Sequence, residues 1–182
     1  MGTSPLTVAG RHHKRLTLSF DNSEYNILKF YQEGFAKQMK SCSGCKLTSV
    51  PWLAADFGPN LTAITQAALL KNPTADVVQA GSNPTLGITQ GATQSGKQAK
   101  VNTIGGLGLS IDNDAIRQGQ MTAANAWPSE WFGYAAVDTF NSVFNGTKSR
   151  DEGLGWQIVD KTHKLPDGDF TGDVDSLRVR VS

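Results

Sequence analysis

Strand-like runs alternate with amphipathic helices about five times along this chain, in repeats of roughly 20–30 residues, which is the size of a βα unit. The first repeat joins a strand-like run, Leu16–Phe20, to a segment with helical spacing of its apolar residues. The predicted inward side of that helix consists of Ile27, Leu28, Tyr31, Phe35 and Met39. Such alternation is typical of an open, mostly parallel sheet with helices on both faces. We therefore predict an α/β fold of three layers, αβα, resembling one Rossmann-like unit.

The 182 residues suffice for one ordinary domain with a real core. We expect an N-terminal segment at residues 1–15, an α/β unit at 16–161, and a polar, poorly ordered tail at 162–182. The unit closes with a helix near 130–145 and a strand at Trp156–Val159. Asn60 and Ser129 are expected to cap the second and last helices.

The charge and hydropathy of the chain exclude several classes of protein. A formal net charge of +1 gives no overall field that would attract nucleic acid. No apolar run approaches the roughly 18 residues of a membrane span. The first ten residues lack the pattern of a signal peptide, although a mature secreted domain would look the same.

The stretch Gly91–Gln98, GATQSGKQ, almost matches the phosphate-binding loop pattern. That pattern requires a strand before it and a helix after it, whereas here a predicted helix comes first and a strand follows. Gln98 also stands where a Ser or Thr hydroxyl would bind magnesium. We therefore interpret the stretch as the end of a helix, with Gly96 as a left-handed cap.

The tail contains an acidic run that resembles the start of a calcium loop. Asp167, Asp169 and Asp173 fit that pattern, but Arg178 stands where a bidentate glutamate is required. We therefore predict no metal site.

No catalytic constellation is evident in the sequence. The three histidines, His12, His13 and His163, lie near the chain ends, away from the predicted strand ends. No G-x-S-x-G is present, and the glycine-rich run Gly105–Gly108 lacks the full dinucleotide fingerprint. We predict that the protein is not an enzyme and uses no cofactor.

Cys42 and Cys45 form a single C-x-x-C between a predicted helix and a predicted strand. One such pair cannot supply the four ligands of a structural zinc. We favour a small disulfide at the helix end in an oxidising compartment, with free thiols in a cytosolic protein as the alternative.

Ligands of open α/β sheets bind beyond the carboxyl ends of the strands. The residues predicted there are aromatic or carry amides and hydroxyls, which suits a small polar molecule held by stacking and hydrogen bonds. The candidate ligand-binding residues are Asn22, Tyr31, Phe57, Ser82, Asn83, Gly105 and Trp127. Tyr31 can also be read as a core residue, because it lies on the inward stripe of its helix.

Several short segments from about Leu16 to Lys161 resemble the type I periplasmic sugar-binding proteins of ABC importers. These segments are EGF at Glu33–Phe35, LLKNPTADVV at Leu69–Val78, AIRQG at Ala115–Gly119 and WFGYAAVD at Trp131–Asp138. The step from helix through Gly96 and Lys97 to the next strand also fits.

This resemblance implies one lobe, the C-terminal one, of a two-lobed clamshell that closes on a sugar-like solute and delivers it to a membrane permease. It implies a periplasmic or extracellular location. In that family the last helix, with the strand after it (130–161), packs on a first lobe whose sequence is not in this chain. We therefore expect the apolar face of the 130–145 helix to be exposed or to form a homodimer.

Carried over by position, Phe57 matches an aromatic residue that packs on the sugar. Tyr31, Gly81 and Gly105 stand where the family has Arg, Asn and Asp, and Trp127 stands near a hinge position that is often polar. The polar groups expected to bind the solute are therefore replaced, which points to an unusual ligand or to weak binding by this lobe alone. The alternative function is the effector-binding domain of a sugar-responsive transcription regulator, which shares the fold.

Overall fold

The computed structural model describes residues 15–81, 85–149 and 155–172, so Ser82 and Asn83 lie outside the described residues. The strands are β1 Arg15–Asp21, β2 Cys45–Pro51, β3 Ala75–Ala80, β4 Asn102–Gly105, β5 Ala123–Ala126 and β6 Gln157–Asp160. The helices are α1 Asn26–Met39, α2 Pro59–Lys71, α3 Thr85–Gln94, α4 Ser110–Arg117 and α5 Ser129–Phe144, with a short 3₁₀ turn, η1, at Ala54–Asp56.

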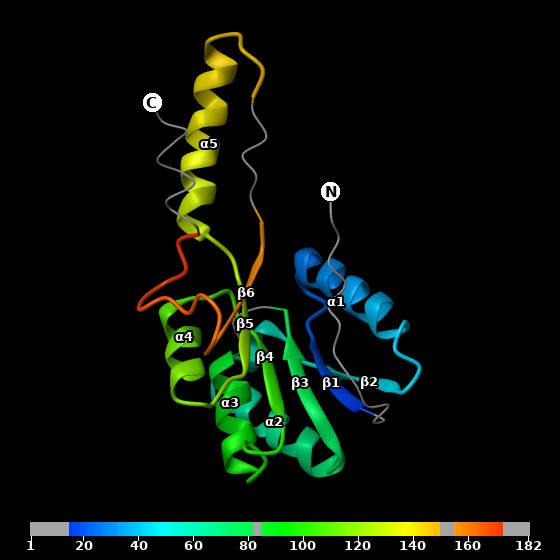
Figure 1. The fold of residues 1–182 in the computed structure, drawn as a ribbon. Helices are drawn as coiled ribbons and strands as arrows, with labels where there is room; N and C mark the ends of the chain where they lie inside the picture. Colours follow the sequence, from blue (N-terminus) through cyan, green and yellow to red (C-terminus); the bar gives the residue numbers. More distant parts are fainter. Residues whose placement is uncertain (1–14, 82–84, 150–154, 173–182) are drawn as a thin grey trace.

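The strands form one sheet in the order β2-β1-β3-β4-β5-β6 (Figure 1). Strands β1 to β5 are parallel, and β6 pairs antiparallel with β5. The chain moves to one side from β1 to β2 and to the other side afterwards. Right-handed crossovers therefore place α1 on one face and the later helices on the other. The predicted α/β architecture with a mostly parallel sheet is confirmed.

The main core lies between the sheet and the α2–α3 layer. Alternate residues of β1, Leu18 and Phe20, point into it beside Val78 of β3. Leu61 of α2 and Ile88 of α3 close it from the helix side. Because α2 and α3 are apolar where they meet the sheet, the hydrophobic effect of burying these side chains stabilises the packing of both helices on the sheet.

The opposite face of the sheet is polar beneath α1. Ser19 of β1 and Gln79 of β3 are both buried, and the Gln79 amide donates to the Ser19 hydroxyl. Leu28 is the buried residue of α1, whereas Ile27 is exposed, so the prediction that Ile27 faces inward is wrong. The partly buried stripe runs instead through Leu28, Tyr31 and Phe35, because the helix is rotated toward the edge of the sheet that Tyr31 reaches.

The glycines of GATQSGKQ have structural roles. Helix α3 ends at Gln94, and Gly96 has a φ of +68°, the left-handed conformation expected of a helix cap. Gly91 lies where α3 crosses α2: a Cβ there would come within 2.5 Å of the Thr65 Cβ and 2.7 Å of the Thr62 carbonyl oxygen. The predicted order of helix, turn and strand is confirmed, and it excludes a phosphate loop.

The predicted capping residues are displaced by one or two positions. Gly58 precedes α2 and Pro59 is its first residue, so Asn60 lies inside the helix. Pro128, rather than Ser129, precedes α5. In both cases a proline near the helix start already sets a helical φ, so a side-chain cap is not needed to begin the helix.

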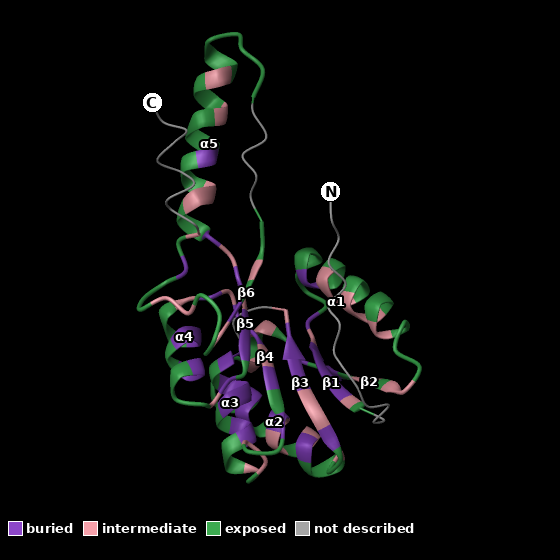
Figure 2. Cartoon of the chain, in the orientation of Figure 1, coloured by how far each residue is buried: buried purple, intermediate pink, exposed green. Residues whose placement is uncertain are grey.

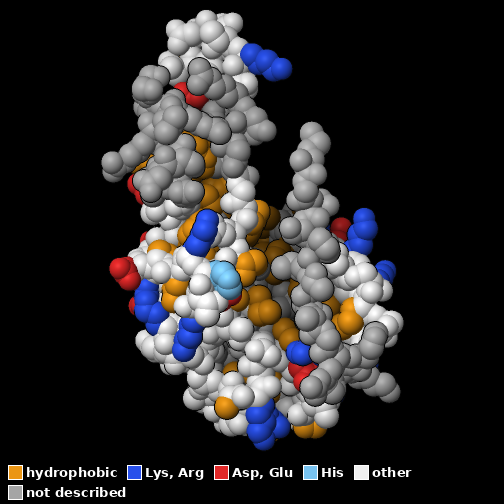
Figure 3. Space-filling model, viewed as in Figure 1, with side chains coloured by type: hydrophobic (Ala, Val, Ile, Leu, Met, Phe, Trp, Pro, Cys, Tyr) orange, Lys and Arg blue, Asp and Glu red, His pale blue; other side chains and the backbone are white. Residues whose placement is uncertain are grey.

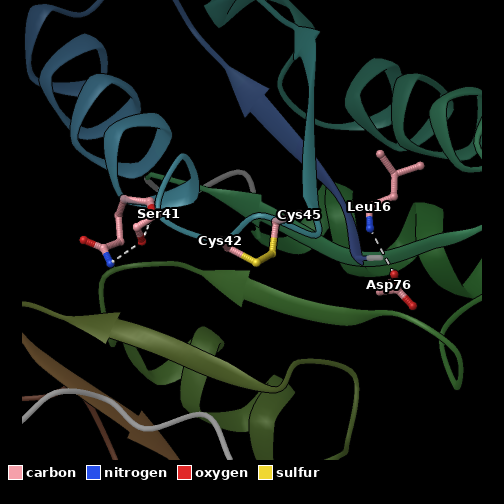
Figure 4. The surroundings of a disulfide bond; sticks show 6 residues. Leu16, Ser41, Cys42, Cys45 and Asp76 are labelled. Carbon is pink, nitrogen blue, oxygen red and sulfur yellow. Dashed lines mark hydrogen bonds between the residues drawn. A yellow bond between two sulfur atoms is a disulfide. The ribbon is translucent and has the colours of Figure 1, made fainter. Parts of the chain in front are cut away.

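Cys42 and Cys45 form a disulfide with a Cα–Cα distance of 5.3 Å. It joins the turn after α1 to the first residue of β2 (Figure 4). Near it, the backbone N–H of Leu16 donates to the Asp76 carboxylate at 3.0 Å, which links β1 to β3. The predicted disulfide is confirmed.

The segment after β6 is packed as far as residue 172. Phe170 is buried against Ile116 of α4 and Val159 of β6. Its backbone N–H donates to the Gly108 carbonyl at 2.7 Å, and the Asn113 amide donates to the Gly168 carbonyl at 2.7 Å. The prediction of poor order is therefore wrong for residues 162–172, because backbone groups of the β4–α4 loop hold this segment.

Helix α5 extends away from the sheet, and most of its surface is exposed (Figures 1 and 2). Ala135 is its buried residue among those described. Within the described ranges, none of the helices combines the length and the apolar character that crossing a membrane would require.

Candidate functional site

Tyr31 crosses the carboxyl edge of the sheet from α1 to β5. The Asn125 amide donates to the Tyr31 hydroxyl oxygen at 2.7 Å. Asn125 alternates with the buried Ala124, which packs against α4, so Asn125 faces the α1 side of the sheet. The contact therefore brings together residues that are 94 positions apart in the sequence.

Burial raises the pKa of Tyr31, and the hydrogen bond from Asn125 partly offsets that effect. The phenol is therefore neutral near pH 7. Because its oxygen accepts from Asn125, its own hydrogen remains available, and the described residues provide no acceptor for it. The pair thus presents a neutral donor and a neutral amide at the edge of the sheet.

Gly81 and Gly105 are glycines because of their neighbours. A Cβ on Gly81 would lie 2.7 Å from Cδ1 of Tyr31, so the Tyr31 ring occupies the space above the end of β3. A Cβ on Gly105 would lie 2.6 Å from the Ala80 carbonyl oxygen of the neighbouring strand. Close packing within the protein is therefore sufficient to explain both glycines.

Polar side chains follow β1 and β2 toward the same edge. The hydroxyls of Ser19 and Ser49 each donate to the Asp21 carboxylate at 2.5 Å. Asn22 is fully buried, and its side-chain oxygen accepts from the Glu24 backbone N–H at 2.8 Å; its amide nitrogen has no partner among the described residues. Asn22 therefore shapes the turn into α1 and lies below the surface.

Phe57 is partly exposed after η1 and packs edge-on against the buried Trp52, with ring centroids 5.0 Å apart. It also borders a mostly apolar pocket of about 300 Å³ beside the starts of α2, α3 and α4. Leu61, Leu86 and Ile111 line the same pocket. These residues belong to the helix layer opposite α1, so Phe57 and Tyr31 approach the edge from different sides.

Trp127 lies between two aromatic rings where the chain leaves β5. Its ring centroid is 4.7 Å from that of Phe132 and 4.7 Å from that of Trp156. Its indole nitrogen is buried and finds no hydrogen-bond partner in the part of the chain that the structure describes. Trp127 thus links the outgoing chain before α5 to the returning chain before β6.

The candidate residues within the described ranges lie in separate groups along the edge of the sheet. Tyr31 joins Gly81, Phe57 joins Trp52, and Trp127 joins Phe132. The sequence reasoning missed Asn125 and Trp156. Asn125 could have been found from the alternation of β5, because it is the one polar residue in AANA.

The described residues offer little for metal or acid–base chemistry. They contain no cluster of three or more His, Cys, Asp or Glu side chains that could hold a metal ion. Within the described ranges the histidine is His163, which contacts Asp160 at 3.1 Å in an exposed turn after β6. The edge of the sheet instead offers aromatic faces and neutral hydrogen-bonding groups, together with the Asp21 carboxylate that Ser19 and Ser49 hold.

No protein-family model matches the chain, and no curated protein matches it. Solved structures of ABC transporter solute-binding proteins do match. A sugar-transport substrate-binding protein from Bordetella parapertussis gives a TM-score of 0.73 at 18% identity, covering 88% of this chain and 55% of that one. A periplasmic solute-binding protein from Actinobacillus succinogenes with bound D-allose gives 0.73 at 17% identity, covering 82% and 54%. One from Agrobacterium vitis with α-D-tagatopyranose gives 0.70 at 18% identity, covering 83% and 51%.

This chain therefore has the fold of one lobe of the sugar-binding proteins of ABC transporters. It spans about half the length of the solved structures named above. At these identities the likeness establishes the fold, while the ligand must be argued from the side chains.

Proposed function

We propose that this chain is a solute-binding subunit, or one lobe of such a subunit, of an ABC importer. It binds a neutral, sugar-like solute at the carboxyl edge of the sheet and performs no chemistry on it. The observation that carries this proposal is the Tyr31–Asn125 pair, a neutral donor and amide held at the edge where ligands of such sheets bind.

The structural neighbours support a sugar as the class of ligand. The proteins from Actinobacillus succinogenes and Agrobacterium vitis were solved with D-allose and with tagatose in its pyranose form. A sugar presents hydroxyls for Tyr31 and Asn125, and its C–H face suits an aromatic ring such as that of Phe57. The side chains identified at the edge include no Lys or Arg that would pair with an anion, and the Asp21 carboxylate already accepts from Ser19 and Ser49, which favours a neutral solute.

We assign supporting roles to the remaining candidates. Phe57 and Trp127 provide aromatic surface near the edge. Gly105 remains a candidate through its backbone, since a Cβ there would meet the Ala80 carbonyl oxygen at 2.6 Å. Asn22 lies beneath the surface and stabilises the turn before α1 by accepting a hydrogen bond from the Glu24 N–H. Ser82 and Asn83 lie outside the described residues and remain candidates on the sequence pattern alone.

The proposed partner is the membrane permease of the importer, and the proposed location is periplasmic or extracellular. The Cys42–Cys45 disulfide supports that location, since disulfides persist in oxidising compartments and are rare in the cytosol. The same bond counts against the alternative, the effector-binding domain of a cytosolic transcription regulator.

Binding can be tested by isothermal titration calorimetry with a panel of neutral aldoses and ketoses. Tyr31→Phe keeps the ring over Gly81 but removes the hydroxyl, so we expect roughly threefold to tenfold weaker binding, the value of one hydrogen bond. Tyr134→Phe is the matched control, because Tyr134 is an exposed tyrosine on α5 that donates to Glu130 at 3.1 Å. If no sugar in the panel binds, or if both variants lose affinity equally, the assignment of the site fails.

A further inference from the structure

Helix α5 carries an apolar stripe on its exposed side. We define the α5 stripe as Val137, Phe140, Val143 and Phe144, whose spacing places them on one side of a helix. Their exposed fractions are 67%, 61%, 63% and 85%. Ala135 lies on the opposite side of the helix and is buried. The side of α5 that packs within this chain is therefore not the side that carries the stripe.

The sheet has a second apolar surface that none of the helices in the described ranges covers. On β6, Val159 packs against α4, so Ile158 points to the α1 side, where it pairs with Asn125 of β5. Ile104 of β4 pairs with Ala123 on that same side. We define the open sheet patch as Ile104, Trp156 and Ile158; Trp156 and Ile158 are 52% and 53% exposed.

The sheet patch lies on the visible side of the molecule in Figure 3. The figure shows hydrophobic side chains gathered over β3 to β6. Helix α1 lies over the β1–β2 end of the sheet and reaches β5 only through Tyr31 (Figure 1). Among the described residues there is therefore an apolar helix face without a sheet against it and an apolar sheet face without a helix against it.

The dimensions of the two surfaces match. The α5 stripe covers positions 137–144, about 11 Å along the axis of a helix that leaves the sheet beyond the carboxyl end of β5. Three strands of about four residues present a patch roughly 13 Å long and wide. A two-fold rotation that inverts one copy would place each α5 over the other copy's sheet, and such an isologous contact closes without leading to fibres.

We propose that two copies of this chain associate reciprocally, with the α5 stripe of each copy packed on the open sheet patch of the other. With about 200 Å² for an exposed aromatic side chain and somewhat less for an aliphatic one, the two surfaces expose about 700 Å² per copy. The dimer would bury about 1,400 Å² in total, within the range of stable interfaces. The formal net charge of +1 per copy opposes the contact little.

The pairing of the surfaces can be tested by cross-linking single-cysteine variants. The native cysteines are joined in a disulfide, so a short bis-maleimide reads only the introduced thiols. We expect Val137→Cys mixed with Ile158→Cys to give a cross-linked pair, and Val137→Cys alone to give none. Cross-linking of Val137→Cys with itself, or a dimer in which the mixture fails to cross-link, would overturn the proposed pairing.

Light scattering after size exclusion tests the association itself. The chain should elute as a dimer of twice its 19.5 kDa, and Phe140→Asp should convert it to a monomer. Ser142→Asp is the matched control, since it adds the same charge two positions away, on the side of α5 that carries Ala135 and faces away from the stripe. A wild-type chain that stays monomeric at 100 μM would overturn the proposal, and another protein domain would then be the occupant of both surfaces.

Discussion

Replacement of Gly81 by alanine tests whether Tyr31 occupies the space over the end of β3. The added Cβ would lie 2.7 Å from Cδ1 and 2.9 Å from Cγ of the ring, whereas carbon atoms pack best about 3.5–4.0 Å apart. The ring must therefore retreat by almost 1 Å, which stretches its 2.7 Å contact with Asn125. The substitution thus disturbs packing and a hydrogen bond together.

The expected cost of Gly81→Ala follows from these two effects. Overpacking costs about 1–3 kcal/mol, and a weakened hydrogen bond costs up to about 1 kcal/mol more. Gly81 does not have a positive φ, so alanine should also recover about 0.4–1 kcal/mol by restricting the unfolded chain. The net loss of unfolding free energy is about 1–3 kcal/mol, or roughly 3–10 °C in Tm for a chain of this size.

The decisive measurement is a double-mutant cycle with Tyr31→Ala, followed by urea denaturation. Without the ring, the Cβ at position 81 meets open space, so Gly81→Ala should become neutral or slightly stabilising. Gly34→Ala is the control, because a Cβ at this mid-helix glycine of α1 has nothing within 4 Å, and it should stabilise the fold by about 0.5–1 kcal/mol. An equal penalty for Gly81→Ala in both backgrounds would refute the reasoning.

Three further predictions concern stability. Gly91→Ala should destabilise the fold by at least about 2 kcal/mol, because its Cβ would meet the Thr62 backbone oxygen at 2.7 Å, which cannot move aside as a side chain can; a denaturation midpoint equal to wild type would contradict this. The double variant Cys42→Ser, Cys45→Ser should lose about 2 kcal/mol, the chain-entropy value of a loop this short, and dithiothreitol should lower the Tm of the wild type but leave that of the variant unchanged. Backbone and side-chain hydrogen bonds from Thr162 lower the pKa of Asp160 to about 2 from 3.8. The stabilisation by Asp160 is therefore complete above pH 3.8 and is lost as the pH falls through about 2; carboxyl NMR titration should give the lowered midpoint, and a midpoint near 3.8 would show that the turn does not hold it.

Local patterns were sufficient to predict the fold of this chain. The alternation of strands and helices correctly indicated a parallel sheet, and the order of elements around Gly96 excluded a phosphate loop. The spacing of the two cysteines at a helix end indicated their disulfide. Each of these inferences depends on residues that are close in sequence, where backbone geometry leaves few alternatives.

The candidate site was harder to predict because its contacts are long-range. A stripe with i, i+4 spacing admits several rotations of α1, so the sequence could not show that Ile27 faces solvent. The bond between Tyr31 and Asn125 depends on how far α1 reaches across the sheet. Phe170 is an isolated apolar residue in a polar stretch of sequence, and its burial depends on backbone groups of a distant loop.

The attachment of α1 has a consequence for local unfolding. Helix α1 has one buried side chain and lies on a polar strip of the sheet, so its connections are few and specific. They are the Glu24 carboxylate, which accepts the Ala54 N–H at 2.5 Å, the Tyr31–Asn125 bond, and the disulfide after its last turn. Such an element opens at lower free energy than the core, so its amides should exchange hydrogen sooner than those of α2 and α3. A solute bound to Tyr31 would slow that exchange, and the protection of α1 would then report occupancy of the site.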